Sequence, residues 1–285
     1  MQKNNFFLIT QKLLPQHLLS RISSYFTNNK YPPLKNFLIK LAINKFNISL
    51  DESEKNNINE FKTFNDFFTR HLLSSARPIE NDGRKIISPA DGSLSQFGTI
   101  DKKNLIQAKG KFFSLDDLLG NHSEISDQLK NGSFFTIYLS PRDYHRVHMP
   151  IDGKLTNMTY IPGKLFSVNS KTTEGISNVF SRNERVVCNF ETEIGIVSIV
   201  FVGALLVASI ITKWHGIVTP SYYNQIQSWD YSHNNISFSK GEEIGHFQFG
   251  STVICCFQRN KLNFKDNLST MSPIKMGDMV ANINM

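Results

Sequence analysis

The first fifty residues carry apolar side chains at a spacing that places them on one face of a helix. In residues 10–28 this face comprises Leu14, Leu18, Ile22 and Tyr25, with Leu13 and Phe26 beside it. Residues 33–46 repeat the pattern with Leu34, Phe37, Leu38 and Leu41, after a break at Pro32-Pro33. The pattern predicts two amphipathic helices with lysines on their polar faces. Neither stretch is a continuous apolar run long enough to span a bilayer.

From residue 85 to residue 257 the pattern changes to short runs of β-branched and aromatic residues, separated by Gly, Pro, Asn and Asp. Residues 194–212 carry no charge, but they are rich in Ile and Val and interrupted by Gly195 and Gly203, which favours buried strands over a membrane helix. Residues 60–73 are expected to add a helix. The predicted fold class is α+β, a mainly antiparallel β core with N-terminal amphipathic helices. The expected strands include residues 134–139, 186–190, 196–202, 206–211 and 252–257.

The charge of the chain is concentrated in the N-terminal helices. The net charge is +7 over 285 residues, while residues 1–49 contain seven basic and no acidic side chains, so the remainder is neutral. A basic segment that is also apolar is typical of proteins that bind an anionic membrane surface. No zinc-ligand spacing or helix-turn-helix pattern indicates a metal site or nucleic acid. Packing of the helices on the protein's own core stays open as an alternative.

The cysteines indicate the compartment. Cys188, Cys255 and Cys256 form no CxxC pair and leave an odd count, which argues against a disulfide framework and favours a reducing environment. The apolar patch at residues 6–9 has no small-residue cleavage site after it, so a secretory signal is not expected. We therefore expect the protein to lie on the cytoplasmic side of the membrane.

Three local motifs carry candidate chemistry. They are Ser88-Pro89-Ala90-Asp91-Gly92, the string Tyr138 to Pro150 with the core Ser-Pro-Arg-Asp-Tyr-His-Arg-Val-His-Met-Pro, and Phe249-Gly250-Ser251-Thr252. Asp91, His148 and Ser251 can form a triad in which the imidazole takes the Ser proton and the carboxylate orients the imidazole. Taken singly, each residue is more often structural: Asp before Gly is a common turn former, and Gly-Ser-Thr is a common turn.

The setting of Ser251 distinguishes two kinds of serine chemistry. A hydrolase nucleophile lies in Gly-x-Ser-x-Gly between a strand and a helix, whereas the apolar residues 253–257 predict a strand after Ser251. Gly250 has no Cβ, so its peptide can adopt strained dihedrals and expose its carbonyl to Ser251 Oγ. This setting favours chemistry on the chain's own backbone.

In order and spacing, the three motifs resemble those of the bacterial phosphatidylserine decarboxylase proenzymes. The similarity runs from about Thr63 to Gly277, while residues 1–60 match less distinctly. Phe249 stands where the family usually has Leu, and this apolar exchange leaves Gly250 and Ser251 intact. Other matching strings are Thr63-Phe64-Asn65-Asp66-Phe67-Phe68, Arg77-Pro78-Ile79, Pro162-Gly163-Lys164-Leu165-Phe166-Ser167-Val168-Asn169, Arg182-Asn183-Glu184-Arg185 and Val202-Gly203-Ala204.

The resemblance implies that Asp91, His148 and Ser251 first act on the chain itself. Ser251 Oγ would attack the Gly250 carbonyl with His148 as general base and Asp91 orienting it, and elimination from the resulting ester would leave a pyruvoyl group at position 251. The catalytic region, residues 61–285, would then be divided. The β subunit would comprise residues 1–250, including a membrane-association segment at 1–60, and the α subunit residues 251–285. Whether the α/β heterodimers pair further stays open.

The resemblance also implies the reaction. A pyruvoyl carbonyl can react with the serine headgroup amine and accept the electrons released with CO2, a task that no ordinary side chain performs. Phosphatidylserine would become phosphatidylethanolamine, with His145 handling substrate and protonation. Arg142 and Arg146 would meet the lipid oxyanions or serve the structure. The protein would be peripheral, on the cytoplasmic face of the cell membrane.

Three other interpretations remain. A pyruvoyl-dependent decarboxylase of a soluble amino acid would share the cofactor but would have little use for the basic, apolar N-terminus. A Ser-His-Asp hydrolase or self-processing peptidase would keep a free Ser251 hydroxyl that reacts with fluorophosphonates. A membrane-binding β domain without activity would have no need for Asp91, His148 and Ser251 together.

Overall fold

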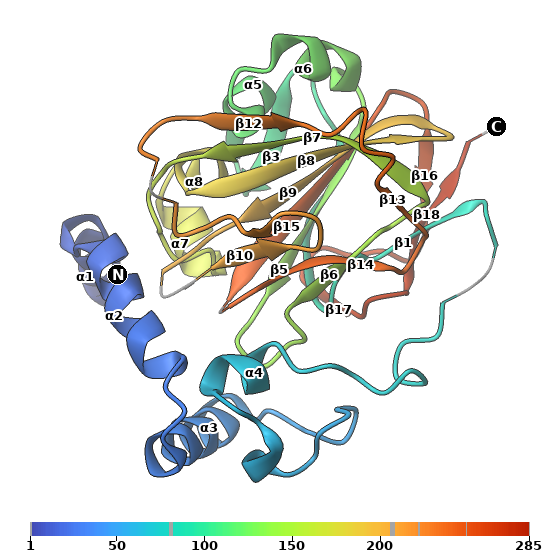
Figure 1. Cartoon of the computed structure of the whole chain (residues 1–285). Helices are drawn as coiled ribbons and strands as arrows, with labels where there is room; N and C mark the ends of the chain where they lie inside the picture. Colours follow the sequence, from blue (N-terminus) through green and yellow to red (C-terminus); the bar gives the residue numbers. More distant parts are fainter. Residues whose placement is uncertain (1, 80–81, 206–208, 222, 249, 285) are drawn as a thin grey trace.

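The core is a nine-stranded antiparallel sheet, seen in the computed structural model of the chain (Figure 1). The structure describes residues 2–79, 82–205, 209–221, 223–248 and 250–284. The strand order is β12-β7-β8-β9-β15-β5-β2-β17, with β13 also paired to β7. The strands are β2 (Gly92–Thr99), β5 (Ser133–Leu139), β7 (Gly153–Ile161), β8 (Arg185–Thr192), β9 (Gly195–Val202), β12 (Gln227–Asp230), β13 (Ser237–Phe238), β15 (Ser251–Phe257) and β17 (Ser272–Ile274).

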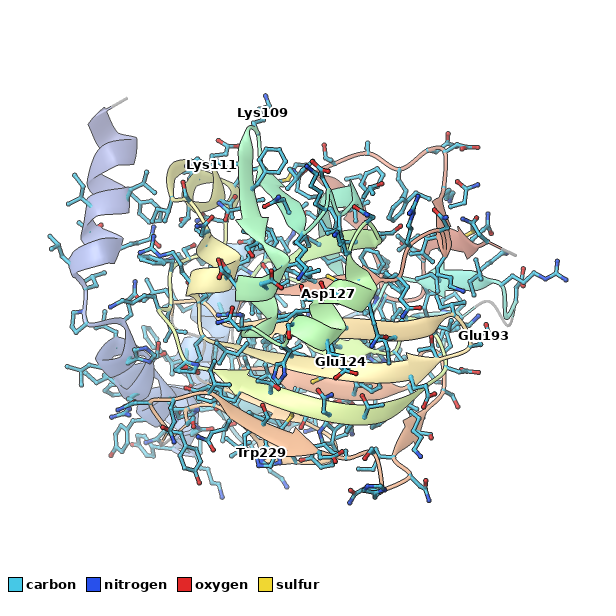
Figure 2. The ribbon with its side chains drawn as sticks, turned by 90° about the horizontal axis from the view of Figure 1, so that it is seen from above. Lys109, Lys111, Glu124, Asp127, Glu193 and Trp229 are labelled. Atoms are coloured by element: carbon cyan, nitrogen blue, oxygen red, sulfur yellow. The ribbon has the colours of Figure 1, made fainter. Side chains whose placement is uncertain are left out.

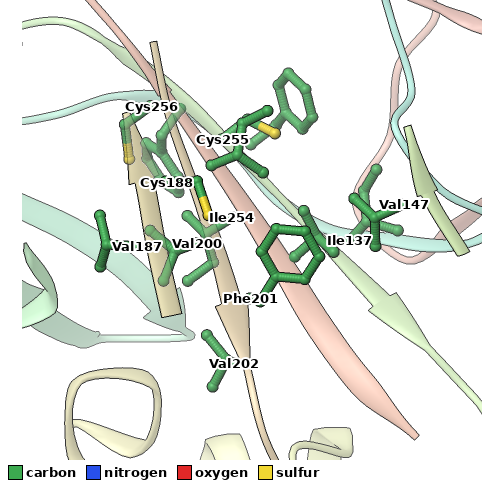
Figure 3. Packing of buried hydrophobic residues seen from close by; sticks show 14 of the residues in the cluster. Ile137, Val147, Val187, Cys188, Val200, Phe201, Val202, Ile254, Cys255 and Cys256 are labelled. Carbon is green, nitrogen blue, oxygen red and sulfur yellow. The ribbon is translucent and has the colours of Figure 1, made fainter. Parts of the chain in front are cut away.

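Strand β15 is central in the sheet, between β9 and β5, and all of its residues are buried. Figure 3 shows the apolar packing around it, with Cys188, Cys255 and Cys256 among valine and isoleucine side chains. The three cysteines are free, and burial raises the pKa of each thiol. They therefore behave as small apolar residues and not as reactive thiols.

Three smaller sheets complete the β structure. Together with the large sheet, they confirm the predicted antiparallel core, because every pairing between these strands is antiparallel. They are β11-β10-β14-β6, β1-β18-β16 and β3-β4. Their members are β1 (Lys85–Ile87), β3 (Asn104–Ala108), β4 (Lys111–Ser114), β6 (Arg146–His148), β10 (Ile210–Thr212), β11 (Gly216–Ile217), β14 (Glu243–Phe247), β16 (Leu262–Phe264) and β18 (Met279–Ile283).

Most of the expected strands are present. Residues 134–139, 186–190, 196–202 and 252–257 lie in β5, β8, β9 and β15. Of the expected strand 206–211, Ile210 and Ile211 lie in β10, while residues 206–208 lie outside the described part. Hairpin tips carry the charged side chains outward, as for Lys109 and Glu193 in Figure 2.

The helices lie at the margins of the β core. In Figure 1, α1 and α2 stand at one side, α3 and α4 lie below them, and the C-terminal strand β18 is at the opposite side. No helix among the described residues is both long and apolar enough to cross a membrane. The helices are α1 (Gln2–Leu13), α2 (Gln16–Thr27), α3 (Pro32–Phe46), η1 (Ile58–Glu60), α4 (Phe64–Phe68), α5 (Leu115–Leu119), α6 (Ser123–Leu129), α7 (Ser170–Gly175) and α8 (Val179–Arg182).

Two predicted helices differ from the structure. The helix over 10–28 is divided between α1 and α2 at Pro15, since proline lacks the N–H donor and clashes with the preceding turn. The helix over 60–73 is shortened to α4. Thr63 caps its start, and after Thr69 the chain turns back to pair with the segment at Ser53. The helix over 33–46 is confirmed as α3.

The face of α1 and α2 that contacts the core combines Leu8, which packs against the apolar core, with several polar side chains. Gln11 donates to Thr172 Oγ1 at 3.1 Å, and its side-chain oxygen accepts from Ser167 N at 2.8 Å. Gln16 Oε1 accepts from Leu165 N at 2.7 Å. Ser20 is also buried against the core. The helices are therefore fixed to the β domain by hydrogen bonds.

The predicted apolar face points the other way. Leu13, Leu14, Leu18, Ile22, Tyr25 and Phe26 are all exposed. The expectation that the lysines line a solvated polar face is wrong for Lys35, which is buried in α3 and donates to the carbonyls of Ile58 and Phe61. The helices are thus turned so that their outer surface is apolar.

Candidate active site

The fold brings the three motifs together around the start of β15. Ser251 lies opposite Leu139 at the end of β5, so the Ser-Pro-Arg-Asp-Tyr-His string follows directly beside it. The backbone of Phe247 donates to the His145 carbonyl at 3.0 Å. The backbone of His148 donates to the Pro89 carbonyl at 2.8 Å, which brings the turn containing Asp91 to the same place.

Ser251 is completely buried, and its hydroxyl has no hydrogen-bond partner among the described residues. Such a buried, unpaired polar group is rare in folded proteins. Gly250 precedes it without left-handed dihedrals, and an added Cβ would meet only ordinary contacts with Leu139 O and Pro141. Phe249 lies outside the described residues.

His148 is held by two hydrogen bonds. Its Nδ1 lies 2.8 Å from the Gly241 carbonyl, which can only accept, so Nδ1 carries the proton. Its Nε2 therefore accepts from the Tyr144 hydroxyl at 3.0 Å. Burial lowers the pKa of His148, an effect that the Gly241 bond and the nearby Asp91 charge oppose only in part. His148 is a neutral base whose lone pair faces Tyr144.

Asp91 is close to His148 but is engaged elsewhere. It forms a two-pronged ion pair with Arg77, through Nε at 2.9 Å and through a short contact to Nη2, and it also accepts from Met276 N at 2.8 Å. Arg77 contacts Glu52 too, at 2.8 Å. Its hydrogen bonds to these two carboxylates, against the effect of burial, raise the pKa of Arg77. No hydrogen bond joins Asp91 to His148 in the described part of the chain, and the Glu243 carboxylate raises the pKa of this imidazole more than Asp91 does.

His145 is completely buried beneath Phe68, with ring centroids 4.2 Å apart. Its Nδ1 donates to the Asp143 carbonyl at 2.8 Å, while Nε2 has no partner within the described residues. Burial lowers the pKa of His145 to about 3. The free lone pair therefore belongs to a neutral imidazole inside the protein.

The two arginines of the string have different environments. Arg146 places its guanidinium against both carboxylate oxygens of Glu243 at 2.8 Å and donates to Thr69 O, so it joins β6 to β14. Arg142 is largely exposed. Arg146 is therefore occupied structurally, whereas Arg142 has a single ion pair, with Asp143 at 3.7 Å, and is exposed enough to meet a ligand.

Sequence reasoning gave no role to Tyr144 or Arg77, although both lie in strings that it singled out. A signal existed for each, since a tyrosine beside a candidate base and an arginine near a buried carboxylate are ordinary partners. The Gly241 carbonyl is a backbone atom, and the sequence carries no signal for it.

Comparison with known proteins agrees with this arrangement. The family model described as phosphatidylserine decarboxylase matches residues 64–282, and a second, described as PSD, matches residues 6–47. Proteins named phosphatidylserine decarboxylase proenzyme are similar over most of both chains. The one from Francisella tularensis subsp. holarctica is 55% identical over 265 residues, 92% of each chain, and that from Francisella philomiragia subsp. philomiragia is 52% identical over 269 residues, 94% of each. The chain therefore belongs to the phosphatidylserine decarboxylase family.

Proposed function

We propose that this protein decarboxylates phosphatidylserine to phosphatidylethanolamine, after cutting its own chain between Gly250 and Ser251. The observation that carries the proposal is the Ser251 hydroxyl, which is buried and has no partner among the described residues, directly after a glycine and at the start of the central strand. The relatives' name, phosphatidylserine decarboxylase proenzyme, supports both the substrate and the processing.

The cut begins with the protein's own residues. Ser251 Oγ attacks the Gly250 carbonyl carbon and His148 Nε2 takes the hydroxyl proton; the C–N bond breaks as the C–O bond forms, giving an ester. Removal of the Cα proton of residue 251 then breaks the Cβ–O bond, so Gly250 leaves as a carboxylate. The resulting enamine takes up water and loses ammonia, leaving the pyruvoyl group.

The residues around His148 set the conditions for this attack. Its Nε2 accepts from Tyr144 in the uncut chain, so the Ser251 hydroxyl must replace that of Tyr144 before it can lose its proton. Once the imidazole is charged, the nearby Asp91 carboxylate stabilises it through space. Arg77 holds the Asp91 carboxylate in place through its two-pronged ion pair.

The two pieces are expected to stay together after the cut. β15 is bonded to β5 along Ser251–Phe257 and to β9 on its other side, and its side chains are buried. The small piece, residues 251–285, also supplies β16, β17 and β18. Cleavage at the first residue of β15 leaves these pairings intact, so an α/β heterodimer results.

The site at residue 251 fits the pyruvoyl group, because it is buried and the unpaired hydroxyl is the group that is converted. Once formed, the pyruvoyl supplies a carbonyl that binds the substrate amine and takes up the electrons released with CO2. His145 is the residue proposed to place the proton that replaces the carboxylate. It is neutral in the uncut chain, and the negative charge of an entering substrate would raise its pKa.

The outward apolar face of α1 and α2 supports a peripheral membrane position. Exposed apolar surface on three basic helices fits insertion into an anionic interface, and the cytoplasmic face is the proposed side.

A groove of about 420 Å³ lies between α2 and the core, lined by His17, Arg21 and Glu184 among others. The backbone N–H of Gly203 donates to the Glu184 carbonyl, and Gly203 directly follows Val202, the β9 residue that pairs with Thr252. We propose this groove as the place where the substrate headgroup enters from the membrane side.

The test is CO2 release from liposomes containing carboxyl-labelled phosphatidylserine. Wild-type protein should release label, Ser251→Ala and His148→Ala should remain uncut and inactive, and His145→Ala should be cut but slow. Release from free serine but not from lipid would favour the soluble-substrate alternative. An uncut wild-type chain that releases no CO2 but is labelled by a fluorophosphonate would favour a hydrolase.

A further inference from the structure

A second polar cavity, of about 470 Å³, lies between the segment that follows α3 and the turns that carry Asp91 and Tyr144. A water molecule occupies about 30 Å³ in the liquid, so the cavity has room for a polyatomic ion. Its lining contains four basic side chains, from elements far apart in the sequence: Arg70, Arg77, Arg142 and Lys275.

Arg70 is the unusual member of this set. The residue is only 6% exposed, yet its Nε and Nη1 have no acceptor among the described residues. Nη2 alone donates, to the Arg142 carbonyl at 3.3 Å, and the guanidinium lies 5.9 Å from the centre of the Phe67 ring. Burial lowers the pKa of Arg70. A buried guanidinium with unsatisfied donors is costly unless an anion completes it.

The carboxylates of the cavity do not supply that anion. Asp91 and Glu52 are both paired with Arg77, and Glu52 also contacts Lys275 at 2.9 Å. Asp143 accepts two hydrogen bonds from Ser140, and Asp51 is exposed at the rim. No carboxylate in the described part of the chain lies within ion-pair distance of Arg70. Arg70 therefore has no ion-pair partner among the described residues, although acidic side chains line the same cavity.

We propose that this cavity, which we call the Arg70 site, binds an oxyanion of the phosphate class. Arg70 reaches it from inside and Arg142 from the rim, where its side chain is 66% exposed. A phosphate has oxygens in several directions and suits donors that converge from different elements better than a planar carboxylate does. A phospholipid headgroup and free inorganic phosphate share this chemistry. Residue 251 is not part of its lining, although Asp91 and Tyr144 of the self-cleavage site are.

The experiment is a calorimetric titration of the purified full-length protein with inorganic phosphate. Arg70→Gln should weaken phosphate binding by about tenfold to hundredfold, the loss expected for hydrogen bonds to a charged group. Arg259→Gln removes the same charge from an exposed position between β15 and β16 and should leave binding unchanged. If Arg70→Gln fails to fold, Arg142→Gln replaces it, with a loss of about two- to fivefold.

A second arm identifies the source of the phosphate. Displacement of bound phosphate by dihexanoylphosphatidylglycerol, which lacks the substrate's amine and carboxylate, assigns the site to a lipid headgroup. Binding of phosphate that depends on Arg70 but resists this lipid assigns it to free phosphate. Absence of binding to wild-type protein, or binding equal in the wild type and in both cavity variants, would overturn the proposal.

Discussion

The outer face of α1 and α2 can be tested with two serine substitutions, Leu13→Ser and Leu18→Ser. The two leucines are 79% and 54% exposed. Complete burial of a leucine contributes about 1.5–3 kcal/mol. Scaling by the exposed fractions gives about 2–4 kcal/mol for burying both in a membrane interface. The double variant should therefore bind anionic liposomes at least about thirtyfold more weakly.

Sedimentation with phosphatidylserine-containing liposomes measures this loss, and thermal unfolding without lipid provides the contrast. The double variant should keep its melting temperature because neither leucine packs on the core. Met271→Ser changes an apolar residue of similar exposure in the loop before β17, outside the helices, and should bind like wild type. Ile39→Ser, at a fully buried position of α3, should instead lower the melting temperature. Unchanged sedimentation of the double variant would refute membrane docking through this face.

Three further predictions concern the site. Gly92→Ala should destabilise the protein by about 1–3 kcal/mol, since its Cβ would collide with the Tyr138 carbonyl; an unchanged urea midpoint would contradict this. Tyr144→Phe should move the acid limb of the self-cleavage rate to higher pH, because losing the hydroxyl that favours neutral His148 raises the pKa of that imidazole; identical pH profiles on gels would show that the hydroxyl does not act on it. Burial lowers the pKa of His145 to about 3 in the folded chain, whereas an unfolded chain titrates at about 6.5. As the pH falls from about 6.5 to about 3, the unfolded chain therefore binds this proton first, and the free energy of unfolding decreases. At pH 4 this loss is up to about 3 kcal/mol, and His145→Gln should lack it in unfolding curves recorded from pH 7 to 4.

The β core was predictable because its strands are short, apolar and bounded by turn residues. β5, β8, β9 and β15 are recognisable as runs of β-branched and aromatic side chains. Their order in the sheet was not predictable, since pairing depends on contacts between distant segments. The central place of β15, on which the stability of a cut chain depends, therefore appears only in the structure.

The orientation of the N-terminal helices could not be derived from periodicity. Hydrophobic spacing locates an apolar face but does not say whether that face meets the core or a membrane. Here the core contacts are made by Gln11, Gln16 and Ser20, residues that composition alone assigns to solvent. The side chains of Gln11 and Gln16 accept hydrogen bonds from backbone groups of the core, so these polar residues face inward while the apolar face is exposed.

The candidate catalytic residues were identifiable, but their partners were not. Asp91, His148 and Ser251 lie in motifs, whereas the environment of each depends on residues brought in from elsewhere, such as Arg77 for Asp91. Arg70 had no sequence signal at all, because an unpaired buried cation is a property of packing.

The most direct test of self-cleavage is the intact mass of the purified protein under denaturing conditions. Two chains are predicted, residues 1–250 and residues 251–285, with a pyruvoyl group in place of the first serine and an end that resists Edman degradation. Ser251→Ala should give one chain of 32.5 kDa. A single uncut wild-type chain that nevertheless releases CO2 from phosphatidylserine would contradict the account.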